Sequence, residues 1–550
     1  MNEKQFKNAC SEICDFIVLH KNRNIDDKIN MDSQPGDLCS VLQKFKFNEN
    51  SKNFTQIFEH FIDVIYPYSL NWQHPLFMGY FPSCNSYPSI LGELLSAGLG
   101  TIGFAWKSCP ALTELEMFSI HEIIRLMHLP FASGNILSSS SEAIMISMIT
   151  AIHRAKIDRN KLVVYTSDLA HSCIYKAASI LQLKISNIAA DKSNWGMNTF
   201  ALKQKIEQDL KKDLIPLYIC ATFGTTSLAS IDNINIIGKI SRKYNIYLHI
   251  DAAYGGNALF IRKYRKMLKG IDYADSININ CNKLMLVNYD CTLVFYKDTA
   301  PVVDALSFDP PYLNSDYNRI DLRNYDISLS RRFRSLKLWF TLHTYGIKGI
   351  RRHMKRLFRR ARILAAMIIK NDTRLEVVNK VKFGLVCFRI KNSNSLTNIL
   401  YQKLSKYQNM YYTSSSIYGF SFIRISINNI KSRNELNYIA SKITKSIDSI
   451  MGPQDSSHPA QTHYTCNTLY EEQLVCLDRR QEINKHANKP IYEKLKSNDY
   501  NDQFEDMLNK AIHNRASEIV KPRRRSISNI IKDKNVFIQK FIQGINTDSR

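Results

Sequence analysis

The stretch Ile246-Tyr247-Leu248-His249-Ile250-Asp251-Ala252-Ala253-Tyr254-Gly255-Gly256 decides the fold of this chain. Its first five residues form a continuous apolar run, which predicts a strand buried on both faces, and Asp251 stands where that strand ends. Similar short runs recur along the chain, and amphipathic stretches such as 234–244 lie between some of them; the runs are at 162–165, 217–220 and 293–296. This alternation indicates an α/β fold with a mostly parallel central sheet over residues 86–345.

Three further regions flank this predicted α/β domain. Residues 1–85 predict helical hairpins around the turn signal Gln34-Pro35-Gly36-Asp37, and so short a helical segment is expected to pack on something larger. Residues 346–452 contain two strand-like runs, each followed by a helical pattern, which indicates a small α+β domain; the runs are at 383–388 and 420–425. Residues 453–550 form a basic, polar extension that is expected to be mostly disordered.

The composition excludes several classes of protein. The 550 residues include 74 Lys+Arg and 49 Asp+Glu, a net charge of +25, which makes nucleic acid or an acidic membrane surface the first partners to consider. No apolar run approaches the roughly 18 residues that span a bilayer, and the first residues are too charged for a signal peptide, so a cytosolic location is predicted. The twelve cysteines form no CxxC pair, which predicts free thiols and no metal site.

Polar residues follow several of the predicted strands. Asp251 closes one strand, Lys283 ends the strand-like run that begins at Ile279, and His171 follows the strand at 162–165. Ligands of parallel sheets bind beyond the carboxyl ends of the strands. An Asp/Lys pair alone is more often a salt bridge, but residues 252–256 are small and would let a flat group approach the backbone. We therefore expect a ligand site here.

Two hydroxyl clusters also follow strands. Thr225 and Thr226 come after the run at 217–220, and Ser138–Ser141 lead directly into a helical pattern that begins with Glu142. Ser139 and Glu142 fit the Ser-x-x-Glu capping box, so helix capping explains these serines on structural grounds alone. A helix N-terminus with several hydroxyls also suits a phosphate group. An anion site, a flat floor, an imidazole, a carboxylate and an amine are together what pyridoxal phosphate requires.

These residues resemble the group II pyridoxal-phosphate-dependent amino-acid decarboxylases, specifically the animal aromatic-L-amino-acid and histidine decarboxylases. The resemblance covers about residues 1–450 in consistent order. The segments that carry it are His74-Pro75 to Tyr80-Phe81-Pro82, Gly103-Phe104-Ala105-Trp106, Thr113-Glu114-Leu115-Glu116, Ser167-Asp168-Leu169-Ala170-His171-Ser172, Gly224-Thr225-Thr226, His249 to Tyr254, Ala274-Asp275-Ser276 and Arg331-Arg332-Phe333-Arg334-Ser335-Leu336-Lys337.

The resemblance implies the fold type I of pyridoxal-phosphate enzymes and a role for each matching residue. Lys283 would form the Schiff base with pyridoxal 5'-phosphate, and Asp251 would bind the pyridine nitrogen. Ala253 would lie under the ring and His171 would stack above it. The phosphate would be held by Ser139, Ser140, Thr226 and Asn280. Tyr312, on a mobile loop that covers the substrate, would return a proton to the Cα carbon. The family also implies a homodimer that exchanges its N-terminal helices.

Four positions depart from the family pattern. Asn282 precedes the lysine where aromatic-amino-acid decarboxylases usually have His, and Leu284 follows it where Trp is common. The segment 131–135 is short and has no glycine triplet before the serines. Asp326-Ile327-Ser328 stands where Gln-Ile-Pro is more frequent. None of these changes removes a group that the electron-sink chemistry needs, but they leave room for a weak enzyme or a catalytically inactive scaffold.

The residues expected in the substrate pocket do not all indicate the same substrate. Ser330 resembles histidine decarboxylases, whereas Phe81 and Ser83 look more like the aromatic group, and His171 belongs to both. A difference of one carbon in a pocket is worth only about 1–3 kcal/mol, so one serine does not decide the substrate. The sequence therefore favours an aromatic L-amino acid (DOPA, 5-hydroxytryptophan or tyrosine) converted to a biogenic amine, with histidine as the alternative.

A polyanion-binding protein is the competing interpretation from another class. The segment 331–362 contains twelve Lys/Arg and no acid. On a helix these residues surround an apolar stripe, which indicates a solvated helix face rather than a binding site for nucleic acid or membrane. Arg523-Arg524-Arg525-Ser526-Ile527-Ser528 resembles a site for a basophilic kinase, where phosphorylation of Ser526 or Ser528 would reverse the local charge. The predicted partners are a small-molecule substrate and a second copy of this chain.

Overall fold

A computed structural model describes residues 1–29, 33–47, 49–82, 85–308 and 320–453. The chain divides into two compact units, Met1–Gln461 and Thr462–Arg550, and the described residues all belong to the first. The sequence prediction for 453–550 therefore falls almost entirely outside the described residues. So do the predictions for Ser83 and for the loop that carries Tyr312.

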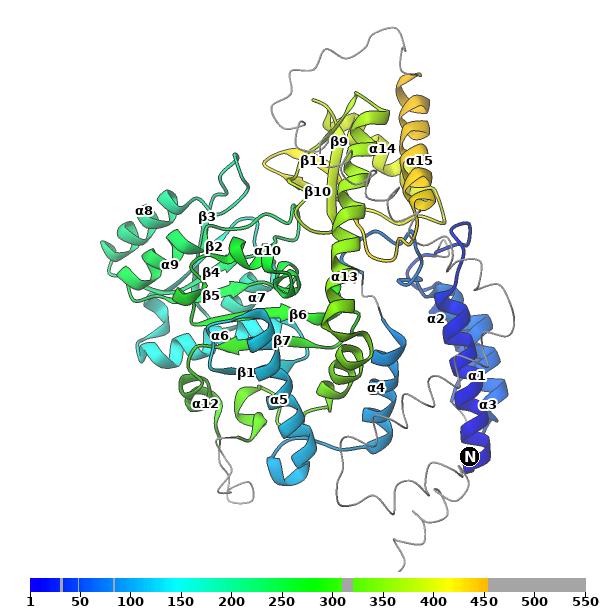
Figure 1. Cartoon of the computed structure of the whole chain (residues 1–550), viewed down its shortest axis with the longest axis horizontal. Coiled ribbons are helices and arrows are strands. Elements are labelled where there is room, and N and C mark those ends of the chain that lie inside the picture. The colour runs from blue at the N-terminus through cyan, green and yellow to red at the C-terminus, as the bar shows by residue number, and fades with distance from the viewer. Residues whose placement is uncertain (30–32, 48, 83–84, 309–319, 454–550) are drawn as a thin grey trace, which may run out of the picture. The chain divides into compact units, whose positions relative to one another are not determined.

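A seven-stranded sheet forms the centre of the first unit (Figure 1), in the order β1-β7-β6-β5-β4-β2-β3. Strands β2 to β6 pair in parallel wherever they are neighbours, and β7 is antiparallel to both β1 and β6, so β1 runs with the parallel set. The prediction of a mostly parallel sheet is confirmed. The strands are β1 (Ser133–Leu137), β2 (Leu162–Ser167), β3 (Lys184–Ile188), β4 (Ile215–Thr222), β5 (Tyr247–Asp251), β6 (Ser276–Asn280) and β7 (Thr292–Tyr296).

Helices cover both faces of this sheet. Val164 and Tyr218 pack on one face against α6 (Ser140–Ala155) and α7 (Cys173–Ile180). Alternate residues of the same strands, such as Tyr165, belong to the main core on the other face. That core also takes apolar residues from α5 (Pro110–Met127), α8 (Thr199–Leu210) and α9 (Ile234–Lys243). Burial of both faces explains why these strands are continuously apolar in sequence.

The sheet register brings the carboxyl ends of six parallel strands to one edge, and five of these ends precede candidate site residues. Thr222 at the end of β4 pairs with Asp251 at the end of β5, and Asp251 pairs in turn with Asn278 of β6. Strands β1 and β2 run in the same direction, so the turns that follow Leu137 and Ser167 lie at this edge too. The segments in which the sequence places candidate site residues therefore converge at the carboxyl edge of the sheet.

A second, antiparallel sheet has the strand order β10-β11-β9-β8. Its strands are β8 (Leu375–Val377), β9 (Leu385–Ile390), β10 (Thr413–Ile417) and β11 (Phe420–Ser426), and helices α14 (Asn394–Ser405) and α15 (Arg433–Met451) pack beside it. Both predicted strands, and the helix after each, are confirmed.

The long helix α13 (Arg334–Asn371) connects the two sheets (Figure 1). Gly346 interrupts it with φ 58° and ψ 164°, a conformation that favours glycine. Acidic residues outside the basic segment 331–362 form ion pairs with basic residues near its start. Arg334 pairs with Asp290, and Lys337 pairs with Glu93 and Asp290. The positive charges in this part of the basic segment are therefore neutralised by ion pairs within the protein.

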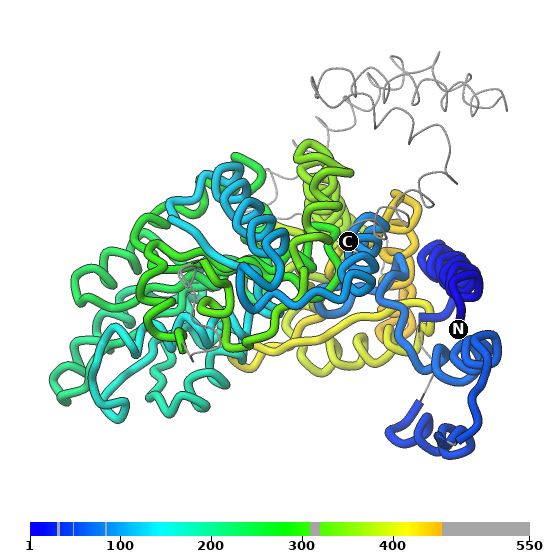
Figure 2. The backbone as a smooth tube through the Cα atoms, turned by 90° about the horizontal axis from the view of Figure 1, so that it is seen from below, coloured from blue at the N-terminus to red at the C-terminus, as the bar shows by residue number. Residues whose placement is uncertain are grey.

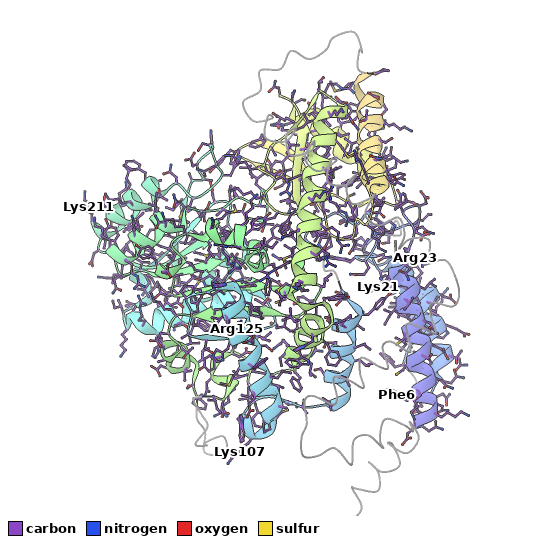
Figure 3. All side chains as sticks on the ribbon, viewed as in Figure 1. Phe6, Lys21, Arg23, Lys107, Arg125 and Lys211 are labelled. Atoms are coloured by element: carbon purple, nitrogen blue, oxygen red, sulfur yellow. The ribbon has the colours of Figure 1, made fainter. Side chains whose placement is uncertain are left out.

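The N-terminal helices lie at the edge of the unit, away from the central sheet (Figures 1 and 2). They are α1 (Glu3–Lys21), α2 (Asp37–Leu42) and α3 (Phe54–His60), followed by α4 (Tyr87–Leu99), which packs on α13. Apolar side chains of α1 face solvent in the single chain; Phe6, labelled in Figure 3, is 57% exposed. Within the described residues, no helix is long and apolar enough to cross a membrane.

Candidate active site

Lys283 lies on the short helix α11 (Cys281–Leu284), which follows β6 at the carboxyl edge of the sheet. Its Nζ is 5.1 Å from the centre of the Phe81 ring. Burial lowers the pKa of Lys283, while the nearby Asp251 carboxylate acts in the opposite direction. A lysine with a lowered pKa has a larger fraction of uncharged, nucleophilic amine at neutral pH, as a carbonyl-binding lysine requires.

Asp251 is held at the end of β5 by groups that are themselves neutral. Its Oδ1 accepts hydrogen bonds from the Ala253 amide at 3.1 Å and from Asn278 Nδ2 at 3.3 Å. His249 Nε2 lies 2.8 Å from Asn278 Oδ1, and its Nδ1 lies 2.7 Å from Ser276 Oγ. Burial lowers the pKa of His249 to about 4, so this imidazole is neutral at pH 7. The chain of contacts fixes the Asp251 carboxylate without placing a cation directly on it.

His171 follows β2 and approaches both charged groups. The Cys173 amide donates to its Nδ1 at 3.2 Å, which leaves Nε2 to carry the proton of the neutral ring. Partial burial lowers the pKa of His171, with Asp251 raising it and Lys283 lowering it further. These influences place the imidazole in the same electrostatic environment as Lys283 and Asp251.

The turn between β1 and α6 contains the candidate phosphate ligands. Ser139 is the N-cap of α6, and its Oγ accepts from the Glu142 amide at 3.2 Å. The predicted capping box is only half formed, because the Glu142 carboxylate accepts from Ser138 instead of from the Ser139 amide. Ser140 Oγ is buried, and no group among the described residues hydrogen-bonds to it. A buried hydroxyl without a partner fits an anion at this helix N-terminus.

Thr226 and Asn280 lie on the same edge of the sheet. Asn280 is the N-cap of α11, and its Oδ1 accepts from the Asn282 amide at 3.1 Å. The side-chain Oδ1 of Asn282, one of the departures from the family pattern, is buried and has no partner among the described residues. The unpartnered Ser140 hydroxyl, the Thr226 hydroxyl and the Asn280 NH₂ group can donate to a phosphate ester. Lys283 supplies the amine that an aldehyde needs, so pyridoxal phosphate fits the site.

The small residues after Asp251 have a different use from the one predicted. A Cβ on Gly255 would lie 2.2 Å from the Phe223 carbonyl oxygen, and a Cβ on Gly256 would lie 2.6 Å from the Ile279 side chain. Both glycines therefore allow close packing inside the protein, not the approach of a ligand. Ala253, at 7% exposed, is the residue of this segment that remains available as a floor.

Arg424 on β11 is a site residue that the sequence did not indicate. Its guanidinium carbon lies 5.3 Å from the centre of the Phe81 ring, and it lowers the pKa of Lys283. Nη2 donates to the Thr226 carbonyl at 2.6 Å, whereas the buried Nε has no acceptor in the described part of the chain. The only sequence signal was an arginine within an apolar strand, since Arg424 lies far along the chain from the other site residues.

Of the predicted substrate-pocket residues, some lie near Lys283 and others do not or are not described. Phe81 contacts the Lys283 group, and its ring centre is 4.1 Å from that of Tyr254. Ser83, like the predicted proton donor Tyr312, lies outside the described residues. Ser330 is exposed in the segment that precedes α13, next to the buried Arg331. The structure therefore brings Lys283, Asp251, His171 and Phe81 together, and it adds Arg424.

Comparisons with known proteins agree with this geometry. The model of the pyridoxal-dependent decarboxylase conserved domain matches residues 35–391. The aromatic-L-amino-acid decarboxylase of Rattus norvegicus is 34% identical over 433 residues, which cover 74% of this chain and 89% of the rat protein. The histidine decarboxylase of Drosophila melanogaster is 32% identical over 482 residues, which cover 82% of this chain and 56% of the fly protein.

A solved structure is also similar over most of the first unit. The crystal structure of Oryza sativa TDC with PLP and tryptamine has a TM-score of 0.79 to this chain, at 26% sequence identity. The match covers 82% of this chain and 99% of the rice chain. The fold of the first unit is therefore similar to that of a protein solved with PLP and tryptamine.

Proposed function

Because the chain belongs to the pyridoxal-dependent decarboxylase family, and is thus a pyridoxal-phosphate-dependent carboxy-lyase, we propose that it decarboxylates an aromatic L-amino acid to a biogenic amine. The candidate substrates are DOPA, 5-hydroxytryptophan and tyrosine. One observation carries the proposal: Lys283, Asp251 and His171 meet at one strand edge beside the aromatic rings of Phe81 and Tyr254.

Each residue has a proposed role. Pyridoxal phosphate, when bound, supplies an electron sink that stabilises the carbanion left by departing carbon dioxide. Lys283 provides the amine that binds the cofactor and is displaced by the substrate amine. Asp251 would accept a hydrogen bond from the protonated pyridine nitrogen and keep it protonated, since its carboxylate is fixed by the Ala253 amide and by Asn278. His171 stacks as a neutral ring, and Ala253 forms the floor.

The phosphate and the substrate carboxylate have separate proposed sites. Ser139, Ser140, Thr226 and Asn280 hold the phosphate, in agreement with the unpartnered Ser140 hydroxyl. Arg424 is proposed to attract the carboxylate of the incoming amino acid, because its buried Nε has no acceptor in the described residues. A buried guanidinium without an anion is costly, so a substrate carboxylate would satisfy it.

Aromatic substrates are favoured over histidine by the pocket wall. The Phe81 ring lies next to Lys283 Nζ and is only partly buried, so it offers an apolar face to an aromatic side chain. Histidine decarboxylation remains the second candidate, supported by Ser330 and by the similarity to the fly histidine decarboxylase. Tyr312 is the proposed proton donor to Cα, and Ser83 is the proposed hydroxyl of the pocket.

A homodimer is the proposed assembly, with residues 1–85 as its dimerisation segment and the cytosol as its location. In α4, which directly follows this segment and is proposed to extend the interface, apolar side chains are 42–57% exposed in the single chain; they are Tyr87, Leu91, Leu94, Leu95 and Leu99. The variant Leu94→Asp/Leu95→Asp should sediment as a monomer where the unmodified chain sediments as a dimer. A monomeric unmodified chain would contradict the proposal.

A substrate panel tests the function directly. The full chain, loaded with pyridoxal phosphate, is incubated with DOPA, 5-hydroxytryptophan, tyrosine and histidine, and carbon dioxide and amine are quantified. Equal amounts of carbon dioxide and aromatic amine are expected, with loss in Lys283→Ala and retention in the exposed control Lys266→Ala. Release of aldehyde and ammonia would contradict the role of Tyr312. A preference for histidine would make the second candidate correct, and Ser330→Gly should then shift activity towards DOPA.

A further inference from the structure

The hairpin that joins β10 to β11 ends in a two-residue turn, Tyr418-Gly419. Both turn residues have positive φ angles, 47° for Tyr418 and 82° for Gly419, as the two central residues of a type I′ turn do. Glycine, asparagine and aspartate adopt this conformation readily, whereas a tyrosine does so at a cost in backbone energy. A tyrosine at this position is therefore explained by its side chain and not by its backbone.

The side chain of Tyr418 contacts two loops next to the central sheet. Its hydroxyl donates to Asp168 Oδ2 at 2.5 Å and accepts from the Ala190 amide at 2.7 Å. Its ring stacks on Trp195, with 6.1 Å between the ring centres, and Lys192 Nζ lies 5.8 Å from the centre of the Tyr418 ring. Both the hydroxyl and the ring are thus engaged at the tip of the hairpin.

Asp168 is the first residue of the loop 168–172 between β2 and α7, which we call the His171 loop. Its Oδ1 accepts from the Ala190 amide at 3.1 Å, and its own amide donates to the Ile188 carbonyl at 3.1 Å. The two carboxylate oxygens therefore join three segments of the chain: the end of β2, the segment after β3 and the tip of the hairpin.

The rest of the His171 loop is compact. The Leu169 amide donates to Ser167 Oγ at 3.2 Å, and the Ala170 amide donates to the Ser167 carbonyl at 3.0 Å. The His171 ring accepts from the Cys173 amide, at the other end of the loop, at 3.2 Å. Because these hydrogen bonds all lie within or next to the loop, its backbone determines where the imidazole lies.

The same hairpin also reaches the site along its length. Arg424 Nη2 donates to the Thr226 carbonyl at 2.6 Å, and Ser415 Oγ lies 3.5 Å from Ser227 Oγ. One pair of strands therefore contacts the segment after β4 with its middle and the His171 loop with its tip. The small sheet can in this way hold two parts of the candidate active site in a fixed relation.

The phenol of Tyr418 is a hydrogen-bond donor near neutral pH. Burial, and then the hydrogen bond to Asp168, raise the pKa of Tyr418 to about 12, so the hydroxyl keeps its proton. A hydrogen bond from a hydroxyl to a carboxylate is stronger than one between two neutral groups. The contact is therefore strong enough to anchor a loop even at a partly exposed position.

We propose that Tyr418 is a positioning residue, whose hydroxyl anchors Asp168 and thereby fixes the His171 imidazole at the candidate active site. The proposal rests on the proposed role of His171 as the ring that stacks on the cofactor. Tyr418 acts through the His171 loop and does not touch the reacting atoms. A purely structural contact between the two sheets is the alternative, and it predicts no specific link between Tyr418 and His171.

Hydrogen exchange in the apoprotein tests the anchor without the cofactor. Tyr418→Phe keeps the ring on Trp195 and removes only the hydroxyl. Amide exchange in the peptides that cover 167–174 and 188–191 should become about tenfold faster, because Asp168 loses a charge-assisted hydrogen bond. Unchanged exchange in both peptides would overturn the proposal.

Tyr244→Phe is the matched control for the loss of a hydroxyl. The Tyr244 hydroxyl donates to the Glu207 carboxylate at 2.7 Å, so the substitution removes the same kind of hydrogen bond in another part of the fold. Exchange in the His171 loop should be the same in Tyr244→Phe as in the unmodified chain. Equal acceleration by Tyr244→Phe and Tyr418→Phe would show a general loss of stability and would overturn the proposal.

Turnover of the loaded enzyme tests whether the anchor acts through His171. Tyr418→Phe should lower kcat/KM about tenfold, and His171→Gln should lower it further. In the double variant, Tyr418→Phe should add less than about twofold to the effect of His171→Gln, because no imidazole is left to position. A full tenfold effect of Tyr418→Phe in the double variant would overturn the proposal, since Tyr418 would then act by another route.

His171→Gln alone separates this proposal from the proposed function. If His171→Gln retains full kcat/KM, the stacking role of His171 is wrong, and the exchange rates alone decide whether Tyr418 anchors the loop. If His171→Gln lowers kcat/KM while Tyr418→Phe changes neither exchange nor turnover, the role of His171 stands and the positioning role of Tyr418 is wrong.

Discussion

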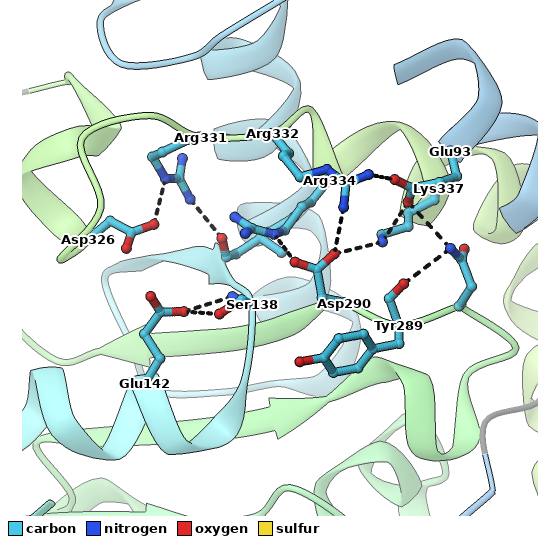
Figure 4. A network of polar contacts seen from close by, with 12 residues as sticks. Glu93, Ser138, Glu142, Tyr289, Asp290, Asp326, Arg331, Arg332, Arg334 and Lys337 are labelled. Atoms are coloured by element: carbon cyan, nitrogen blue, oxygen red, sulfur yellow. Dashed lines mark hydrogen bonds and ion pairs between the residues drawn. The ribbon is translucent and has the colours of Figure 1, made fainter. Parts of the chain in front are cut away.

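The candidate active site has two ends: Asp251 marks the ring end, and the turn Ser138–Ser140 with Glu142 marks the phosphate end. Each end contains a carboxyl group, but the two groups are held in different ways. At the ring end, Asp251 accepts two hydrogen bonds from neutral amide donors, and a neutral imidazole supports one of these donors from behind. At the phosphate end, Glu142 accepts from the Ser138 amide and hydroxyl, and the buried Arg331 pairs with Asp326 (Figure 4). The carboxylate of the ring end is thus held by neutral donors, whereas the acids beside the phosphate end are engaged by Ser138 and by a guanidinium.

The largest expected effect is at the ring end. Asp251→Asn removes the negative charge while it keeps the size of the side chain, so the pyridine nitrogen would no longer be held protonated. Decarboxylation by the loaded enzyme should fall at least about a hundredfold, by comparison with other groups that control a proton in catalysis. The cofactor should still bind, as its visible absorbance would report. Unchanged turnover would show that the charge at this end is not required.

The next effect tests the neutral support behind Asp251. Asn278→Ala removes the Nδ2 donor at 3.3 Å and separates Asp251 from His249. The loss of one hydrogen bond to a buried carboxylate predicts a decrease in turnover of about tenfold. Asn278→Asp would place a second acid next to Asp251 and should lower turnover further. If both variants keep full turnover, the ring end does not depend on its neutral partners.

A smaller effect is expected from the packing beneath the ring end. Gly255→Ala would place a Cβ 2.2 Å from the Phe223 carbonyl oxygen, so the backbone after Asp251 must shift. Overpacking of this kind should lower the free energy of unfolding by about 1–3 kcal/mol, measured by denaturant titration. The control Gly98→Ala, in α4, would place its Cβ in open space with nothing within 4 Å and should not destabilise the protein. Equal stability of both variants would contradict the packing role of Gly255.

The smallest effect concerns the imidazole of His171, which is proposed to stack above the cofactor ring. Because burial lowers the pKa of His171, this ring should stay neutral at pH 6.5, the ordinary midpoint of histidine. Protonation at lower pH would add a positive charge beside Lys283, so kcat/KM should decrease only on the acid side of pH 6.5. A decrease at or above that pH, present with His171 and absent in His171→Gln, would contradict the neutral ring.

The strands could be predicted from the sequence where a short apolar run marks them. The strands at 162–167, 215–222 and 247–251 are continuously apolar because both faces of the sheet are covered, and the polar residues after them mark the ring end. β1 was not predicted, because Gly134 and Asn135 weaken its apolar pattern. The structure shows why glycine is required there, since a Cβ on Gly134 would lie 1.9 Å from the Val294 carbonyl oxygen of β7.

Contacts between distant segments could not be predicted from one sequence. Arg424 reaches the Lys283 group from the small sheet, and Glu116 reaches Arg331 across more than two hundred positions. Ser139 and Glu142 matched a capping box, yet the Glu142 carboxylate accepts from Ser138. The ring end is largely readable from residues next to strands, whereas the phosphate end is assembled by the tertiary fold.

The attachment of the cofactor is the most direct test of this account. The loaded full chain is reduced with borohydride, which fixes pyridoxal phosphate on the lysine that holds it, and the digested peptides are examined by mass spectrometry. The account predicts the phosphopyridoxyl group on Lys283, with no labelled peptide after reduction of Lys283→Ala. A label on another lysine, or an unlabelled Lys283 in a fully loaded protein, would contradict it.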